Sequence, residues 1–288
     1  METEALAHSP TIPISKSHKD MSLSKKLLYL VPNSITYLSL CFGLAAIKLS
    51  IEGRINNDLD MFLRASYFII YSGLCDFFDG AIARMTHTTS TFGGQFDSLC
   101  DLVSFGVTPA FLLYNFSLHA DPYGFMICLL FVGGGAYRLA RFNTQALDGK
   151  CGGYSSGIPI PMPAALVAAL IMTYEEIMSY DSEMVKSSPF VGFIFGLCSD
   201  KEFIRRLLAF YMIICTVGMV STFKYFSNKM LKLPDSKTGK IVTISCIIMC
   251  ALLLNYHFVF SSLFILTVYC IHGPIVWAVE KINMLMDH

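Results

Sequence analysis

The sequence predicts an all-α membrane protein, a polytopic bundle of about eight transmembrane helices. Three observations support this fold class. Of the 288 residues, 54% are hydrophobic and only 15% are charged, whereas soluble domains carry roughly 25% charged residues. The mean hydropathy is +0.57, and the apolar residues gather in long runs. The net charge is zero, and the chain lacks the basic surface with interleaved aromatics that nucleic-acid binding requires.

Eight apolar segments are long enough to cross a bilayer, whose core of about 30 Å needs roughly 20 helical residues. Segment 181–202 is too short to span and is expected to lie along the membrane interface. A tight turn near 255–257 separates the last two candidates. The expected spans are 28–49, 60–83, 96–119, 123–142, 161–180, 203–225, 240–256 and 258–280.

The ends of the chain and the basic residues indicate an orientation. Residues 1–24 are rich in Ser, Thr, Pro and Lys, and are expected to form a disordered cytoplasmic tail. With the N-terminus inside, about two thirds of the 21 Lys and Arg residues fall on the cytoplasmic side. The loop at about 85–92, between the second and third helices, then faces the cytoplasm.

Four aspartates lie at the adjoining ends of the second and third helices. Asp76 and Asp79 are three residues apart, and Asp97 and Asp101 are four apart, so each pair shares one helix face. The short connection at 85–92 makes the two helices antiparallel neighbours. We therefore expect the two acidic faces to meet.

Buried carboxylates indicate a metal. Each costs about 2.5 kcal/mol or more within a bilayer, and four of them repel one another. Arg84 is the one Lys or Arg between Asp76 and Asp101, which leaves room for hard divalent cations such as magnesium or manganese. Magnesium keeps positions open for phosphate oxygens, and Gly80 and Gly93 would let a diphosphate or nucleotide approach. Capping of helix ends would explain one or two aspartates, not four.

Residues 76–101 read D-x-x-D-G-x-x-A-R, eight residues, G-x-x-x-D-x-x-x-D. This pattern resembles the signature of the CDP-alcohol phosphatidyltransferases at every fixed position and both gaps. Further stretches are similar to one branch, the membrane-embedded phosphatidylserine synthases of bacteria and archaea. They are 31–36 (VPNSIT), 101–110 (DLVSFGVTPA), 137–143 (YRLARFN) and 157–161 (GIPIP).

The resemblance implies a homodimer in the bacterial inner membrane, with an active site open to the cytoplasm. It would transfer the phosphatidyl group of CDP-diacylglycerol to serine and release CMP. The six-helix transferase core would cover 25–230, and 231–288 would add two C-terminal helices. By the resemblance, Asp101 would be the general base and could also touch metal. The expected metal ligands are Asp76, Asp79 and Asp97, and the expected nucleotide-side residues are Gly80, Arg84 and Gly93.

Arg138 and Arg141 are candidates for binding the substrate serine. They lie three residues apart near the cytoplasmic end of the fourth helix, and an arginine fork suits a carboxylate. They could instead bind lipid phosphate or anionic headgroups.

Alternative functions share parts of this pattern. A sister transferase using glycerol 3-phosphate, inositol or another alcohol would carry the same signature. Acidic intramembrane residues also occur in cation transporters, although those sites lie near mid-membrane on broken helices. Direct displacement and a two-step reaction both fit the residues.

Overall fold

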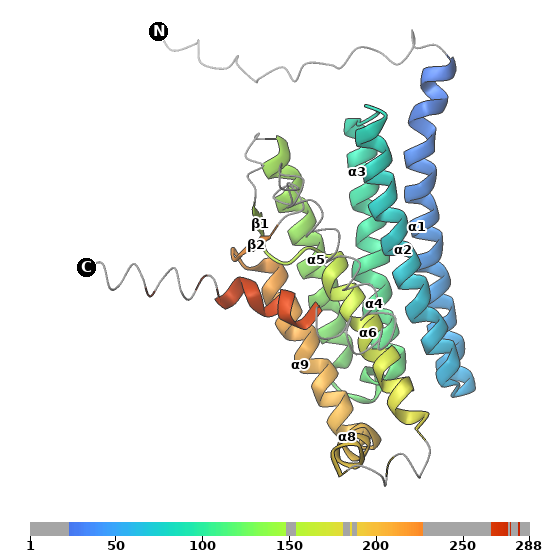
Figure 1. The fold of residues 1–288 in the computed structure, drawn as a ribbon, viewed down its shortest axis with the longest axis vertical. Helices are drawn as coiled ribbons and strands as arrows, with labels where there is room; N and C mark the ends of the chain where they lie inside the picture. The colour runs from blue at the N-terminus through green and yellow to red at the C-terminus, as the bar shows by residue number, and fades with distance from the viewer. Residues whose placement is uncertain are drawn as a thin grey trace, which may run out of the picture.

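A computed structural model describes residues 23–147, 154–180, 189–226 and 266–275, together with Val185, Trp277 and Ile282. In these residues the chain forms a helical bundle, which confirms the all-α prediction (Figure 1). A helix lies at each of the six expected core spans. The expected tail lies almost wholly outside the described residues, as does the seventh span, and the eighth is described mainly as the helix Leu266–Ile275.

The first two helices form an antiparallel pair along one side of the bundle (Figure 1). They are α1, Leu23–Asn56, and α2, Leu59–Met85. Asp58 caps the start of α2 by accepting a hydrogen bond from the backbone N–H of Asp60 at 2.9 Å. On another side, α2 packs against α6, Pro161–Met178.

The third membrane segment is composite. It begins as α3, Thr91–Asp101, continues as the π-helical turn η2, Leu102–Val107, and ends as α4, Thr108–Phe116. Within it, the N–H of Thr108 donates to the carbonyl of Val103, five residues earlier. A π turn holds one extra residue in the helix and is often found at functional sites. This turn begins directly after Asp101.

The remaining helices complete the bundle. The single-turn 3-10 helix η3, Leu118–Ala120, leads into α5, Gly124–Leu147, which packs against α9, Lys201–Val220. The short α8, Pro189–Ser199, falls in the segment expected not to span. Two three-residue strands, β1 Tyr154–Ser156 and β2 Lys224–Phe226, pair antiparallel and join the chain after α5 to the chain after α9.

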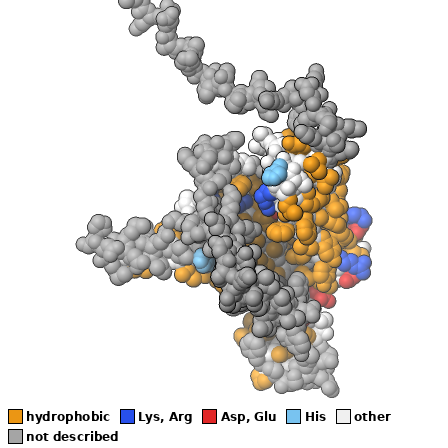
Figure 2. Space-filling view, turned by 45° about the horizontal axis from the view of Figure 1, so that its top comes forward, with side chains coloured by type: hydrophobic (Ala, Val, Ile, Leu, Met, Phe, Trp, Pro, Cys, Tyr) orange, Lys and Arg blue, Asp and Glu red, His pale blue; other side chains and the backbone are white. Residues whose placement is uncertain are grey.

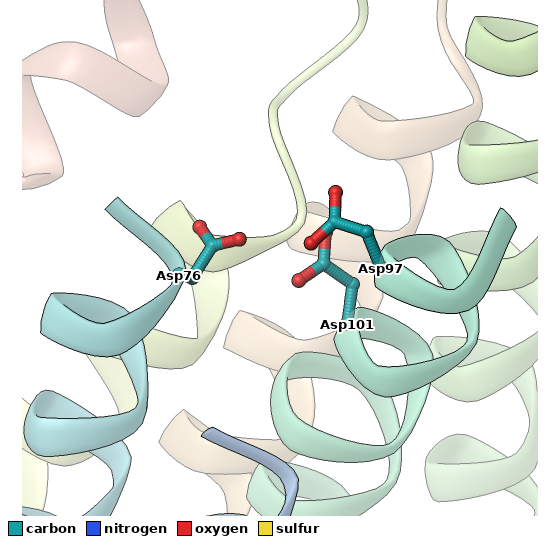
Figure 3. Close-up of side chains that lie close together, drawn as sticks. All are labelled: Asp76, Asp97 and Asp101. Carbon is teal, nitrogen blue, oxygen red and sulfur yellow. The ribbon is translucent and has the colours of Figure 1, made fainter. Parts of the chain in front are cut away.

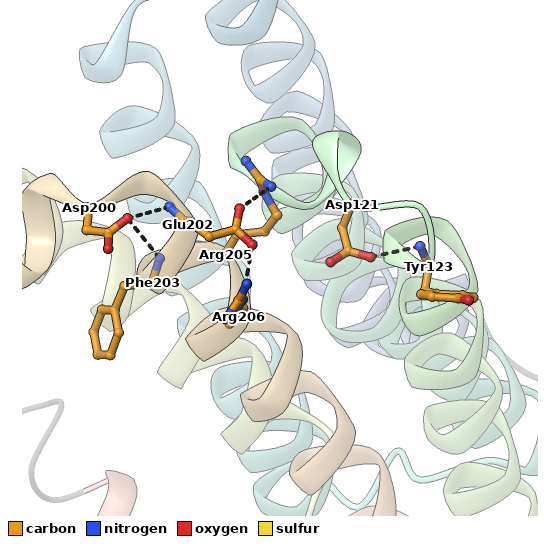
Figure 4. Close-up of polar contacts among 7 residues, drawn as sticks. All are labelled: Asp121, Tyr123, Asp200, Glu202, Phe203, Arg205 and Arg206. Carbon is orange, nitrogen blue, oxygen red and sulfur yellow. Dashed lines mark hydrogen bonds and ion pairs between the residues drawn. The ribbon is translucent and has the colours of Figure 1, made fainter.

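The hydrophobic core lies where α4, α5, α6 and α9 meet. Fully buried residues from these four helices include Leu112, Phe131, Val167 and Met212. Polar contacts gather at the start of α9 (Figure 4). There Asp200 caps α9 by accepting from the N–H of Glu202 at 2.9 Å. Glu202 in turn pairs with Arg205 and Arg206, at 2.6 and 3.0 Å.

Four described stretches are long and apolar enough to cross a membrane: Leu28–Asn56, Thr91–Phe116, Gly124–Gln145 and Lys201–Val220. The 27-residue α2 is long enough but carries five charged residues, including Asp76 and Asp79. Hydrophobic side chains cover much of the described surface (Figure 2). The chain is an integral membrane protein.

Candidate active site

Three of the four predicted carboxylates come together between α2 and α3. Asp76 extends from the last turns of α2, and Asp97 and Asp101 extend from successive turns of α3, toward the same point (Figure 3). One carboxylate oxygen from each residue lies within 4.8 Å of the others. The two helices do not pack closely on each other, because α3 rests mainly on α1. The acidic faces therefore meet through their side chains.

This donor set fits a hard divalent cation. It offers only carboxylate oxygens, which magnesium and manganese prefer, and three such charges within 4.8 Å repel one another unless a cation lies between them. Asp97 Oδ1 is buried, and among the described residues it has no hydrogen-bond partner. Because a buried polar atom without a partner is costly, that oxygen is suited to ligate a metal. The ligand roles stay predictions.

Asp79 is held differently from the other three. Its side chain is only 4% exposed, and its Oδ2 accepts a hydrogen bond of 2.6 Å from the hydroxyl of Thr36 on α1. It is not one of the three clustered carboxylates. The structure thus places Asp79 beside the cluster, fixed to α1, and its predicted metal-ligand role is untested.

Gly80 and Arg84 lie in the last turns of α2, and Gly93 lies in the first turn of α3. A Cβ atom at Gly80 would lie 3.2 Å from Nη1 of Arg84, so the guanidinium passes over this glycine. Gly93 is in the first turn of α3, where its N–H donates to the N-cap Ser90 at 2.9 Å. A Cβ there would lie 3.3 Å from Oδ1 of Asn33, on α1. Both glycines therefore permit close approaches.

The two predicted arginines have different surroundings. Arg138, on α5, is 8% exposed and lies within electrostatic range of Asp101 and Asp76. Its guanidinium carbon is 5.4 Å from the ring centroid of Phe142, which suits a cation–π contact. The structure therefore brings Arg138 to the acidic cluster.

Arg141 instead binds backbone carbonyls. Its Nη1 donates to Val220 at 2.8 Å, and its Nη2 donates to Ser156, Ser221 and Met219 at 2.7, 2.9 and 3.1 Å. These carbonyls belong to the C-terminal end of α9 and to β1. Arg141 therefore joins α5 to the end of α9 and to β1. Its role in binding a substrate stays a prediction.

The site also includes polar residues that the sequence did not single out. Besides Thr36, they are Ser98 and Asn143, which join α3 to α5: Asn143 Nδ2 donates to Ser98 Oγ at 3.0 Å. Ser98 directly follows Asp97, so this bond fixes α3 at the cluster. Thr36, Ser98 and Asn143 all lie in the stretches that resemble the transferases, and that resemblance was the available signal.

Several known proteins are similar to this chain. A CDP-diacylglycerol–serine O-phosphatidyltransferase of Helicobacter pylori strain J99 is 35% identical over 168 residues, covering 58% of this chain and 67% of that protein. One from Saccharomyces cerevisiae is 34% identical over 180 residues, covering 60% and 59%. An archaetidylserine synthase of Methanothermobacter thermautotrophicus is 33% identical over 145 residues, covering 50% and 58%. The chain thus spans about three fifths to two thirds of these relatives.

The model of one family, the CDP-alcohol phosphatidyltransferases, matches residues 29–195, more than half of the chain. The match begins in α1, which carries Thr36, and runs through α2 and α3, which carry all four aspartates, to α8. The signature, the clustered carboxylates and the relatives agree. The chain belongs to the CDP-alcohol phosphatidyltransferase family.

Proposed function

We propose that this chain transfers the phosphatidyl group of CDP-diacylglycerol to the hydroxyl of L-serine, giving phosphatidylserine and CMP, in a reaction that depends on a divalent cation. The observation that carries the proposal is the cluster of Asp76, Asp97 and Asp101, whose carboxylate oxygens converge from two helices. Its place within the family's matched region supports the same reaction class.

The acidic residues would hold the cation. Asp76, Asp97 and Asp101 are the proposed ligands, with Asp79 as a further one. When bound, magnesium or manganese would neutralise charge on the diphosphate oxygens of CDP-diacylglycerol. Gly80, Arg84 and Gly93 are the proposed residues on the nucleotide side of the substrate: Gly80 lets the Arg84 guanidinium lie close to α2, and Arg84 adds a positive charge there.

Asp101 is the proposed general base. A serine hydroxyl is a weak nucleophile at neutral pH, so a positioned carboxylate must take its proton during attack. The serine oxygen forms a bond to the phosphorus that carries the diacylglycerol. The bond from this phosphorus to the bridging oxygen breaks, and CMP leaves with that oxygen. Asp101 keeps the proton until solvent removes it, and no covalent enzyme intermediate is required.

The relatives favour serine as the acceptor. The bacterial, yeast and archaeal relatives are named for serine-containing products or substrates, although the archaeal name specifies a different lipid. Arg138 is the proposed partner of the serine carboxylate, because it is buried at the cluster and offers a planar fork. Binding of the lipid phosphate by Arg138 is the competing role.

The proposed setting is a bacterial inner membrane, with the site open to the cytoplasm and the protein a homodimer. The distribution of the basic residues supports this orientation, because it places the loop at 85–92 on the cytoplasmic side. This loop joins α2 to α3 at the aspartate end of the bundle. Crosslinking in native membranes would test the dimer. A chain that stays monomeric there would contradict it.

The decisive experiment incubates purified protein with CDP-diacylglycerol, manganese or magnesium, and one alcohol at a time. We expect CMP release and phosphatidylserine only with serine, and neither after chelation or in the Asp97→Asn variant. A product formed only with glycerol 3-phosphate or inositol would identify a sister transferase. Cation uptake into proteoliposomes without CMP release would identify a transporter.

A further inference from the structure

Three buried serines from three helical elements meet close to the acidic cluster. They are Ser39 on α1, Ser72 on α2 and Ser104 in η2, and none is more than 2% exposed. The hydroxyls of Ser39 and Ser72 are 2.7 Å apart. The carbonyl of Ser39 accepts from Ser72 Oγ at 3.1 Å and from Ser104 Oγ at 3.3 Å. Each of the three hydroxyls can donate one of these hydrogen bonds, so all three serine side chains have a hydrogen-bond partner.

Each serine lies about one helical turn from a residue of the site. Ser72 precedes Asp76 by four residues, and Ser104 follows Asp101 by three. Ser39 follows Thr36 by three residues, and Thr36 holds Asp79. Residues three or four apart share a helix face. The serines therefore form a layer directly beneath the carboxylates.

The contact between α1 and η2 is unusually close at this layer. A Cβ atom at Gly43 would lie 3.0 Å from Ser104 Oγ and 3.1 Å from Thr108 Oγ1. Thr108 Oγ1 lies 3.2 Å from the carbonyl of Gly43 and 2.9 Å from that of Val103. Because α3 rests on α1 more than on α2, α1 is the common surface for both aspartate-bearing helices.

We propose that Ser39, Ser72 and Ser104 are positioning residues that set the separation between Asp76 and the two carboxylates of α3, and thereby the affinity and size preference of the cation site. This inference rests on the proposed metal site. In a membrane, apolar burial gives helices little preferred register, so interhelical hydrogen bonds help to specify it. Small changes in carboxylate separation matter because magnesium requires oxygens at about 2.0–2.1 Å and calcium at about 2.3–2.6 Å.

The test measures cation binding in the full-length protein without substrates. The Mn²⁺ dissociation constant is obtained by electron paramagnetic resonance titration, and Ca²⁺ competes in a second titration. Ser39→Ala and Ser104→Ala should weaken Mn²⁺ binding about three- to tenfold, the scale of one or two such hydrogen bonds. They should also improve the relative binding of Ca²⁺, because a looser site accepts a larger ion.

Ser66→Ala is the matched control. Ser66 is equally buried on α2, and its hydroxyl donates to the carbonyl of Phe62 in the same helix at 3.0 Å. Removing this hydroxyl should leave the Mn²⁺ dissociation constant unchanged. If the Ser39 and Ser104 variants bind Mn²⁺ as Ser66→Ala does, or lose only thermal stability, the positioning role is wrong.

Asp97→Asn separates this inference from the proposed function. If Asp97→Asn still binds Mn²⁺ like the unaltered chain, the metal site itself is wrong. If Asp97→Asn loses binding while both serine variants keep it, the metal site stands and the positioning role fails. Should Ser39→Ala not fold, Ser104→Ala decides alone, because it removes the hydrogen bond from η2 to the Ser39 carbonyl and leaves the one from Ser72 in place.

Discussion

The hydroxyl of Thr36 on α1 donates a hydrogen bond of 2.6 Å to Oδ2 of Asp79 on α2. A helix without any of the four aspartates thus fixes one of them. Since hydrogen bonds to charged groups contribute about 1.5–3 kcal/mol, losing this bond should disturb Asp79.

We therefore expect Thr36→Val to lower kcat for CMP release by about tenfold or more, because Val keeps the shape but cannot donate. Thr36→Ser should retain most of the activity. Steady-state CMP release at saturating substrates measures both. Equal activity in the Val and Ser variants would mean that the bond does not support catalysis.

Neutralising the carboxylates should reveal two classes of aspartate. Asp76→Asn, Asp97→Asn and Asp101→Asn should lose Mn²⁺ binding, and turnover should fall at least about a hundredfold. Asp79→Asn should also lose turnover but only weaken Mn²⁺ binding, because Asp79, the further proposed ligand, lies outside the cluster of three carboxylates. Membrane insertion should be unchanged in all four. Near-normal turnover of Asp97→Asn at saturating magnesium would refute the site.

Replacing Arg138 should affect serine more than lipid. We expect Arg138→Gln to raise the KM for serine about tenfold, since one charge-assisted interaction is lost, with a smaller rise for Arg138→Lys. The KM for CDP-diacylglycerol should change little. A rise confined to CDP-diacylglycerol would instead make Arg138 a phosphate or headgroup ligand.

Replacing Arg141 should affect stability. Arg141→Gln removes the donors to the four carbonyls at the end of α9 and in β1, at a cost of about 2 kcal/mol or more. The melting temperature in detergent should fall, and the KM for serine should not rise. An unchanged melting temperature with a raised KM for serine would return Arg141 to the substrate site.

Topology can be tested at the two ends of the α1–α2–α3 hairpins. Cysteines introduced at Thr89 and Asn56 are both exposed and lie at opposite ends of α2 (Figure 1). A membrane-impermeant maleimide added to intact cells should label Asn56→Cys above the background of the unaltered chain. Thr89→Cys should react only after the membrane is opened. The reverse pattern would invert the orientation.

Hydropathy and spacing predicted much of this arrangement. The six core spans coincide with described helices, because apolar length decides what crosses a bilayer. The spacing of Asp76, Asp97 and Asp101 correctly indicated that their faces meet. The contact of Asp79 with Thr36 was not predicted, since an apolar span does not reveal how its helix is rotated. Three of the four carbonyl contacts of Arg141 also depend on the fold, because they join segments about 80 residues apart.

The π turn after Asp101 changes the direction in which the helix faces on its two sides. One extra residue changes the phase by about 100°, so the face that α3 presents need not continue along α4. Below the turn, α4 directs Leu112 and Leu113 into the core, while above it Asp97 and Asp101 face Asp76. Deleting one residue within 102–107 would put both halves back in a single phase. The acidic face and the apolar face could then no longer be aimed independently.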